Sequence, residues 1–210
     1  NGSGKTTLLD IVAGIAQPDT GTVEQGQTVQ IGYYRQQSQE LDDNLRVLQY
    51  IEGIRLAVKT ASGDTISASK MLERFLFEGS DQWTYIRDLS GGERRRLYLL
   101  GILMEEPNVL LLDEPTNDLD IETRTVLEDF LEDFPGVVLA VSHDRWFLDK
   151  TMDHLFCLDG RGNVTPFTGS FSEYVAQIPS PQGERAIEKK DTRGKREKTK
   201  LSYKEQREYE

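Results

Sequence analysis

Two adjacent carboxylates, Asp113 and Glu114, stand at the end of the apolar run 109–112. The run has the length and composition of a strand buried on both faces, and the turn-forming Pro115 follows the acids. In open α/β proteins, ligands bind beyond the carboxyl ends of such strands. One acid of this pair would hold a Mg²⁺ ion while the other polarises a water molecule. An acidic surface turn is the alternative interpretation.

A candidate phosphate-binding loop occupies residues 1–7 and matches most of the pattern G-x-x-x-x-G-K-[ST]. In this pattern backbone N–H groups hold phosphates, Lys5 reaches the β- and γ-phosphates, and the Thr6 hydroxyl ligates Mg²⁺. A helix predicted over 5–13 would point its amino terminus at the same phosphates. The candidate binding residues are Asn1, Gly2, Ser3, Gly4, Lys5, Thr6 and Thr7.

The first glycine of that pattern, and a strand before it, do not precede Asn1. We therefore expect the sequence to be a fragment of a longer chain whose further strand lies inside the sheet.

A second glycine-containing motif, Leu-Ser-Gly-Gly-Glu at 89–93, opens a helix predicted over 93–104. Ser90 is a favourable N-cap, and Gly91 and Gly92 leave backbone amides open to an anion. Taken alone, the motif predicts only the start of a helix.

Polar residues also follow two further predicted strands. His143 comes directly after a second buried strand, predicted over 137–141, and this position favours function over the structural role usual for a lone histidine. Gln36 and the close runner-up Gln37 follow a strand predicted over 29–34, for which a short strand at 22–23 is the predicted neighbour. A solvated polar loop is the alternative for the glutamines.

Helices are predicted for much of the remaining sequence. Residues 41–88 are helical in pattern, with a break at 61–65, and form with the next helix a compact helical subdomain of about 41–104. Another helix is predicted over 121–134. Trp146 and Phe147 are expected to be core residues.

Composition limits the classes of protein that remain. The 210 residues suffice for one large domain and a tail, and a hydrophobic content of 37% suffices for a core. No apolar run approaches the roughly 18 residues of a membrane helix, so we expect no membrane span. The single cysteine, Cys157, lies in an apolar stretch and is expected to be a reduced core residue of a cytosolic protein.

The net charge of −11 conceals an asymmetry. Residues 181–210 contain ten Lys or Arg against seven Asp or Glu, which leaves 15 basic and 29 acidic residues in 1–180. An acidic body argues against a nucleic-acid surface there. The basic tail does not share that objection.

In this order, the phosphate-binding loop, Leu-Ser-Gly-Gly-Glu, the strand with Asp113 and Glu114, and Ser-His-Asp-Arg at 142–145 resemble the nucleotide-binding domain of ATP-binding cassette (ABC) proteins. The resemblance covers residues 1–178. It implies an α/β P-loop NTPase fold with a helical signature subdomain, and ATP and Mg²⁺ as ligands. In this family two cassettes close around ATP, and Ser90, Gly91 and Gly92 of one would cap the γ-phosphate held by the other.

The resemblance also assigns roles to individual residues. Glu114 would orient and deprotonate the attacking water, with His143 and Gln36 fixing its geometry. Asp113 would hold Mg²⁺, as would Thr6 and Gln36. Asp120 would help to couple the two sites.

The loop 113–120 and the segment 167–174 resemble the ABC-F class of soluble two-cassette proteins, and Asp118 with the charged tail resembles the second cassette of its Uup-like branch. This implies a cytoplasmic ATPase that acts on ribosomes. Two alternatives remain: the ATP-binding subunit of a membrane transporter, against which the loop sequence and the charged tail argue, and a DNA-binding ATPase.

The tail carries the second of these alternatives. Residues 179–200 have the composition of a flexible charged linker, and 201–210 begin a helix with Ser202 as its N-cap. In Uup-like proteins a coiled-coil domain associated with nucleic-acid binding begins in this way, and the linker would contact phosphates. A solvated spacer without a ligand is the alternative.

Overall fold

The structure, a computed structural model, describes residues 4–35, 40–59, 63–117, 119–160 and 162–177. The chain forms two compact units, residues 1–174 and 175–210, and the elements that carry the candidate site belong to the first. The predictions for Asn1, Gly2, Ser3, Gln36, Gln37, Asp118, the linker 179–200 and the helix 201–210 lie outside the described residues.

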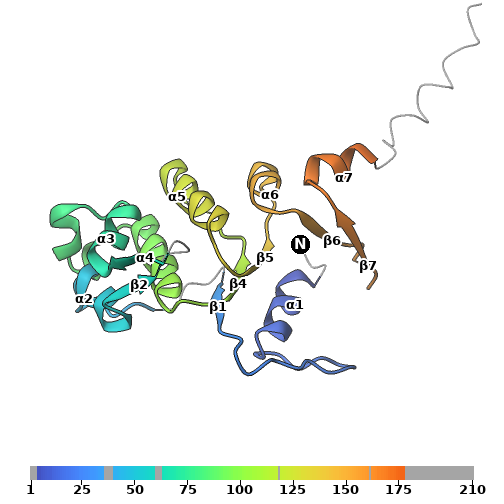
Figure 1. Ribbon diagram of the computed structural model, residues 1–210, viewed down its shortest axis with the longest axis horizontal. Helices are drawn as coiled ribbons and strands as arrows, with labels where there is room; N and C mark the ends of the chain where they lie inside the picture. The colour runs from blue at the N-terminus through green and yellow to red at the C-terminus, as the bar shows by residue number, and fades with distance from the viewer. Residues whose placement is uncertain (1–3, 36–39, 60–62, 118, 161, 178–210) are drawn as a thin grey trace, which may run out of the picture. The chain divides into compact units, whose positions relative to one another are not determined.

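Three parallel strands form the central sheet in the order β1 (Ile31–Tyr34), β4 (Val109–Asp113), β5 (Val137–Val141) (Figure 1). Leu112 of β4 lies beside Tyr34 on one side and beside Ala140 on the other. Because all three strands run the same way, their carboxyl ends meet at one edge. The polar residues that follow the strands are therefore brought together.

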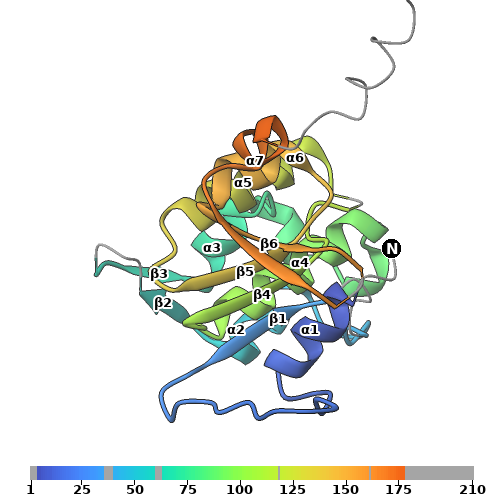
Figure 2. The same cartoon turned by 90° about the vertical axis from the view of Figure 1, so that its right-hand side faces the viewer.

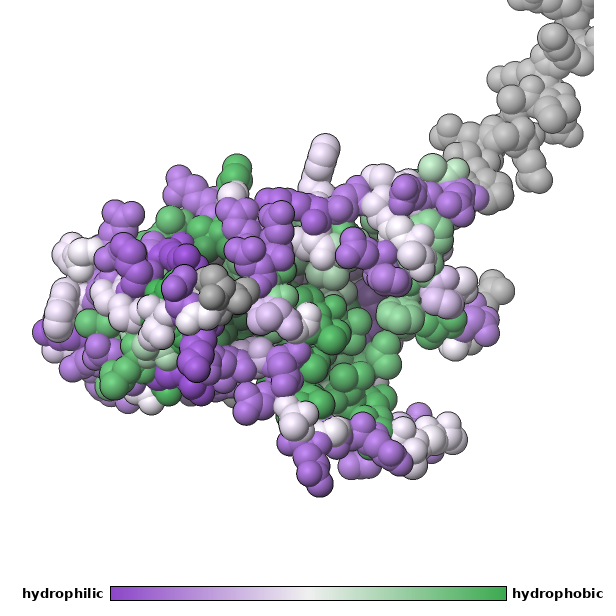
Figure 3. Space-filling view, viewed as in Figure 1, coloured by the Kyte–Doolittle hydropathy of each residue, from purple (hydrophilic) through white to green (hydrophobic). Residues whose placement is uncertain are grey.

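The middle strand β4 is buried as predicted, with three consecutive leucines, 110–112, fully inaccessible. The prediction that β5 is equally buried is wrong, since Val137 is 63% exposed. Among the described residues β5 pairs only with β4, and its other edge has no neighbouring strand. Figure 3 shows apolar side chains gathered at the surface between α1 and β6, on this side of the sheet.

The strand predicted over 29–34 begins two residues late, and residues 22–23 form no strand. The backbone N–H of Val29 donates to the carbonyl of Gly26 at 3.1 Å, so it closes a turn instead of joining the sheet. Val23 is 51% exposed and has no ladder partner in the described part of the chain.

Helix α1 (Lys5–Val12) starts beside the end of β4 and runs along the sheet. It follows Gly4, whose φ of 83° lies in the left-handed region that favours glycine, and its last turn ends before Gly14 at φ 73°. Figures 1 and 2 place α1 on one side of the strands, opposite α5 (Ile121–Glu132) and α6 (Arg145–Thr151).

The helical subdomain contains α2 (Val47–Ile54), α3 (Ala68–Arg74) and α4 (Gly91–Met104). Between α2 and α3 the chain forms an antiparallel hairpin, β2 (Ala57–Lys59) and β3 (Thr65–Ser67), where only helices were predicted. Val58 and Ile66 pair across the hairpin, and Ile66 lies between the polar residues Thr65 and Ser67, which is a period of two and not of 3.6. Two short 3₁₀ helices complete the subdomain, Gly79–Trp83 and Ile86–Asp88.

Helix α4 joins this subdomain to the sheet. Its residues from Arg96 to Met104 are all buried, and they belong to a hydrophobic core that is continuous with β4 and with α5. Figure 1 shows α4 between the subdomain and β1. A helix that is buried all round holds its first turn in a fixed place, so the Leu-Ser-Gly-Gly-Glu motif sits on a rigid support.

Beyond β5, the chain forms α6, the antiparallel pair β6 (His154–Leu158) and β7 (Val164–Thr168), and α7 (Phe171–Gln177). Phe147 is fully buried as predicted, but Trp146 is 85% exposed. Successive residues of a helix point about 100° apart, so the two neighbours cannot share the core face. Cys157 is a free, half-buried thiol. No helix in the described part of the chain is long and apolar enough to span a membrane.

A close backbone approach fixes the start of β5. A Cβ added at Gly136 would lie 2.4 Å from the carbonyl oxygen of Asn108, which accepts a hydrogen bond from Val137. We expect Gly136→Ala to lower the free energy of unfolding by about 1–3 kcal/mol, because the backbone beside β4 must shift. Urea unfolding followed by far-UV circular dichroism measures the change.

Gly53 in α2 is the matched control, because a Cβ there meets no atom within 4 Å. Gly53→Ala should raise the free energy of unfolding by about 0.5–1 kcal/mol. Equal destabilisation by both substitutions would contradict the assigned close contact.

Candidate active site

Asp113 and Glu114 occupy the carboxyl end of β4 and are buried, at 2% and 9% exposure. The N–H of Glu114 donates to the carbonyl of Val141 at 2.8 Å, which extends the pairing with β5 by one residue. Glu114 then leaves the strand at φ 52°, a left-handed conformation that costs a non-glycine residue about 1–3 kcal/mol. Backbone strain at this point fits a residue whose position serves chemistry.

His143 lies against the Glu114 carboxylate, as its place after β5 suggests. Its Nε2 is 3.2 Å from Glu114 Oε1, and its backbone N–H donates to Oε2 at 3.2 Å. The imidazole is 62% exposed while the carboxylate is nearly inaccessible. The contact therefore fixes the direction of the acid and leaves the histidine open to a ligand.

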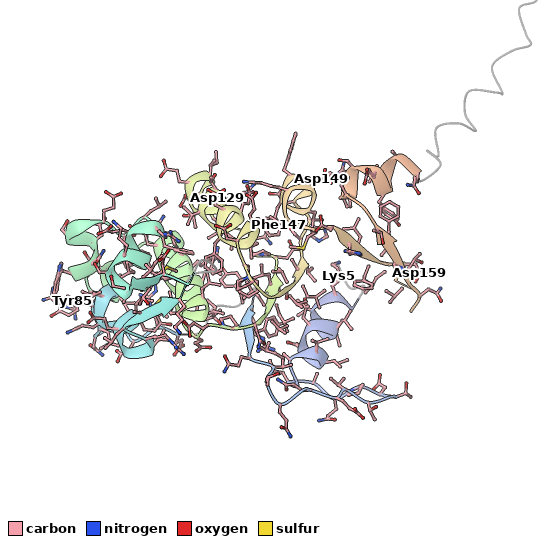
Figure 4. The ribbon with its side chains drawn as sticks, in the orientation of Figure 1. Lys5, Tyr85, Asp129, Phe147, Asp149 and Asp159 are labelled. Atoms are coloured by element: carbon pink, nitrogen blue, oxygen red, sulfur yellow. The ribbon has the colours of Figure 1, made fainter. Side chains whose placement is uncertain are left out.

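Thr6 and Asp113 come together from opposite ends of the sequence. The Thr6 hydroxyl donates to Asp113 Oδ2 at 2.8 Å, so the first turn of α1 touches the end of β4. Lys5, labelled in Figure 4, precedes it as the first residue of the helix. The structure thus joins the candidate phosphate loop to the acidic pair.

This donor set fits Mg²⁺. A hydroxyl and a carboxylate are the hard oxygen ligands that Mg²⁺ prefers, and Mg²⁺ is usually held by one or two protein groups together with substrate phosphates. The described residues contain no group of three or more His, Cys, Asp or Glu suited to a metal. Thr6 and Asp113 are the candidate protein ligands of Mg²⁺; the third predicted ligand, Gln36, lies outside the described residues.

The signature motif, Leu-Ser-Gly-Gly-Glu at 89–93, lies at the start of α4. Ser90 and Glu93 form a capping box: the Ser90 backbone donates to the Glu93 carboxylate at 2.8 Å, and the Glu93 backbone donates to Ser90 Oγ at 3.3 Å. The Ser90 hydroxyl also donates to Glu93 at 2.7 Å, and this bond holds the pKa of Glu93 below its ordinary value. A Cβ at Gly91 or Gly92 would meet nothing within 4 Å, so no described atom crowds the α-carbon on that side.

Among the described residues, the backbone N–H and hydroxyl of Ser90 bond to Glu93, and its carbonyl accepts the backbone N–H of Arg94 at 2.9 Å. None of these bonds reaches Thr6, Asp113 or Glu114.

Asp120 is the N-cap of α5. It accepts the backbone N–H of Thr123 at 2.7 Å, which is the main reason that the pKa of Asp120 lies below its ordinary value. It also accepts the Thr123 hydroxyl at 2.9 Å and lies 3.5 Å from Arg96 of α4. The sequence suggested Asp120 alone; Arg96 and Thr123 gave no local signal.

A second cluster missed from the sequence links α1 to the end of β1. Asp10 accepts hydrogen bonds from Tyr33 at 3.1 Å and from Arg35 at 2.5 Å. Burial, with the Asp10 charge adding to it, raises the pKa of Tyr33 to about 12. Arg35 also stacks on the Tyr33 ring, with 5.1 Å between its Cζ and the ring centroid. The cluster fixes the residue that precedes Gln36.

The family described as ABC transporter matches residues 1–117 of the chain. The chain is 53% identical over its whole length to "Uncharacterized ABC transporter ATP-binding protein YfmR" of Bacillus subtilis, and covers 34% of that protein. It is 40% identical over 93% of its length to "Energy-dependent translational throttle protein EttA" of Escherichia coli K12, covering 35%. It is 38% identical over its whole length to "ATP-binding protein Uup" of Escherichia coli K12, covering 34%. The chain thus spans about one third of these relatives.

Solved structures share the fold. One, with a TM-score of 0.66 and 24% identity over 85% of this chain and 35% of the other, is a complex of archaeal ribosomal stalk protein aP1 and ribosome recycling factor aABCE1. Another, with a TM-score of 0.63 and 19% identity over 84% of both chains, is an ATP-binding subunit of an ABC transporter. These similarities confirm the predicted fold, an ABC-type nucleotide-binding domain of the α/β class.

Removal of the Ser90 hydroxyl tests the capping box. The folded-state pKa of Glu93 is depressed, so its contribution to stability is present above the unfolded pKa and is lost as pH falls through the folded pKa. In Ser90→Ala the largest cause of the depression disappears. We expect the Glu93 pKa to rise towards its ordinary value and the stability at pH 7 to fall by about 0.5–2 kcal/mol. Carboxyl titration by NMR and urea unfolding at pH 7 measure the two effects.

Ser67 is a control, because it caps α3 by accepting from the Lys70 backbone. Ser67→Ala removes a comparable cap and should leave the Glu93 pKa in place. An unchanged Glu93 pKa in Ser90→Ala would contradict the assigned cause.

Proposed function

The chain belongs to the ABC transporter family of ATP-binding proteins, and we propose that it is the ATP-hydrolysing cassette of a Uup-like ABC-F protein. In this proposal the protein is cytoplasmic and acts on ribosomes. One observation carries the enzymatic part of the proposal. The buried Glu114 carboxylate is aimed by His143 and stands next to the Asp113–Thr6 contact. The proposed base, Glu114, is thus adjacent to the proposed Mg²⁺ and phosphate site at Asp113 and Thr6.

The substrate ATP lies with its phosphates at the amino terminus of α1. Gly4 there has the left-handed backbone that brings amide groups towards an anion, and Lys5 supplies positive charge. Thr6 and Asp113 hold Mg²⁺, which when bound neutralises charge on the phosphates. Asn1, Gly2, Ser3 and Thr7 complete the loop in this proposal.

Hydrolysis requires a water molecule in line with the γ-phosphorus. Glu114 accepts a proton from this water, and the oxygen of the water forms a bond to the γ-phosphorus. The bond between the γ-phosphorus and the bridging oxygen breaks, and its electron pair goes to ADP. The products are ADP and inorganic phosphate. His143 keeps the carboxylate in position through its imidazole and backbone N–H, and its exposed ring faces the γ-phosphate. Gln36 orients the same water.

A second cassette completes the site. Ser90, Gly91 and Gly92 lie at the amino terminus of α4, where Ser90 is the N-cap. In this proposal they act on a nucleotide held by another cassette, because a helix amino terminus favours an anion. Two such domains close around ATP and separate after hydrolysis.

The ribosome as partner rests on relatives, of which one is named a translational throttle protein. Another relative is named an ABC transporter ATP-binding protein, which keeps transporter association as the first alternative. A DNA-binding ATPase that uses residues 179–210 is the second alternative, and the basic balance of the tail favours it.

Trapping the ATP-bound state distinguishes association with ribosomes from association with membranes or with DNA. We expect Glu114→Gln in the full-length protein to lower kcat by about 10²–10⁴-fold, because the amide cannot accept the proton. The variant should accumulate on ribosomes when a lysate is sedimented with ATP. Phosphate release and immunoblotting of ribosomal, membrane and DNA fractions measure the two effects.

Glu132→Gln, an exposed position at the end of α5, is the matched control and should behave as wild type. A Glu114→Gln protein with undiminished ATPase activity would refute the assignment of the base. An inactive variant that stays with membranes or DNA would leave the chemistry intact and refute the ribosomal partner.

A further inference from the structure

Arg96, in the second turn of α4, is a buried cation without a role in the mechanism above. The residue is 8% exposed, and its Cζ lies 4.8 Å from the centre of the Phe77 ring. Its Nη1 donates to the Thr123 hydroxyl at 2.9 Å. A buried guanidinium is costly to desolvate and requires a partner. Its hydrogen-bond partner, Thr123, belongs to α5 and not to the helical subdomain.

The contacts of Arg96 continue to Asp120 in one direction. The Thr123 hydroxyl accepts from Arg96 and donates its own hydrogen to Asp120 Oδ2 at 2.9 Å. Arg96 Nη1 also lies 3.5 Å from the same carboxylate oxygen. Thr123 is fully inaccessible, so water does not compete for its hydroxyl. The three side chains form a continuous link from α4 to the start of α5.

The link joins two places that matter in the proposed function. Helix α4 begins at Ser90, whose motif acts on the nucleotide of a second cassette. Asp120 ends the loop that begins at Glu114, and Asp118 of that loop lies outside the described residues. Both ends of the loop are therefore fixed, Glu114 by His143 and Val141 and Asp120 by α4.

We propose that Arg96 is a positioning residue that couples the signature end of α4 to the loop 114–120, so that contact of Ser90 with the opposing cassette's nucleotide orients Glu114 in its own. This inference rests on the proposed function and deepens it. A displacement of α4 is transmitted because the helix is buried from Arg96 to Met104 and the Arg96–Thr123–Asp120 link is short. Arg96 touches neither ATP nor the attacking water.

The alternative is that Arg96 only stabilises the fold. In that case methionine, an apolar side chain of similar length, would replace it without loss, because buried ion pairs often contribute no net stability. A coupling role predicts instead that the Arg96→Met protein folds and loses kcat while its KM for ATP is kept.

Arg94 supplies the matched control. It lies two residues earlier on α4 and pairs with Asp43 at 2.6 Å and with the Ile86 carbonyl at 2.9 Å, both within the helical subdomain. Arg94→Met removes a cation from the same helix without touching the loop 114–120.

In the full-length protein we expect Arg96→Met and Thr123→Val each to lower kcat by about 5–150-fold, with KM for ATP changed by less than about threefold. The double variant should be no worse than the more affected single one, because both substitutions break one link. Arg96→Lys keeps a cation within reach of Thr123 and should recover part of kcat. Arg94→Met should keep wild-type kcat.

Hydrogen exchange provides a readout independent of activity. The amides of Thr123 and Arg124, which bond to Asp120, should exchange faster in Arg96→Met and unchanged in Arg94→Met. Wild-type kcat and wild-type exchange in folded Arg96→Met and Thr123→Val would overturn the inference. If Arg96→Met fails to fold, Thr123→Val decides alone. If the wild-type protein hydrolyses no ATP, the proposed function fails, and exchange still decides the link.

Discussion

The parallel pairing of β4 between β1 and β5 is the constraint on which the rest of the site depends. It sets Asp113 beside Val141, and the hydrogen bond from Glu114 to Val141 carries the register one residue beyond the strand. A shift by one residue would reverse every side chain of β4, turning the leucines of the core and the acids of the site to the wrong faces. The buried leucines therefore hold the acids in place, since any slip would expose apolar surface worth about 25 cal/mol per Å². Packing of the core thus determines the positions of Asp113 and Glu114.

Two carboxylates side by side in a nearly inaccessible place are costly to keep ionised. The contacts described around them are mainly dipolar: the Thr6 hydroxyl on Asp113, the His143 backbone N–H and imidazole on Glu114. Such donors fix the direction of a carboxylate and lower its energy, yet they do not cancel two negative charges. A divalent cation would offset these charges, and the oxygen donors present suit one.

Much of the fold follows from short-range pattern. The bounds of β4, α4 and the Ser90 cap were predicted closely, because four apolar residues before acids and a capping box before an apolar helix are local signals. The hairpin β2–β3 was missed because each strand has three residues, too few to distinguish a period of two from a helix. Contacts between distant parts of the chain gave no signal. Arg96 and Asp120 are 24 positions apart, and three adjacent arginines look alike in the sequence although Arg94 and Arg96 face different partners. Burial of Phe147 but not Trp146 likewise depends on the rotation of α6, which its sequence leaves open.

The exposure of both tryptophans has an optical consequence. Trp83 is 57% and Trp146 85% exposed, and the chain contains no others. An indole already in water emits at long wavelength, so unfolding shifts this protein's intrinsic fluorescence very little, and the signal is a poor monitor of denaturation. The same property makes it a sensitive monitor of contact. Trp146 lies three residues after His143 on the first turn of α6, where any surface that comes to rest against it will shift its emission to the blue. Trp146 fluorescence therefore reports contact at the first turn of α6, and it reports unfolding poorly.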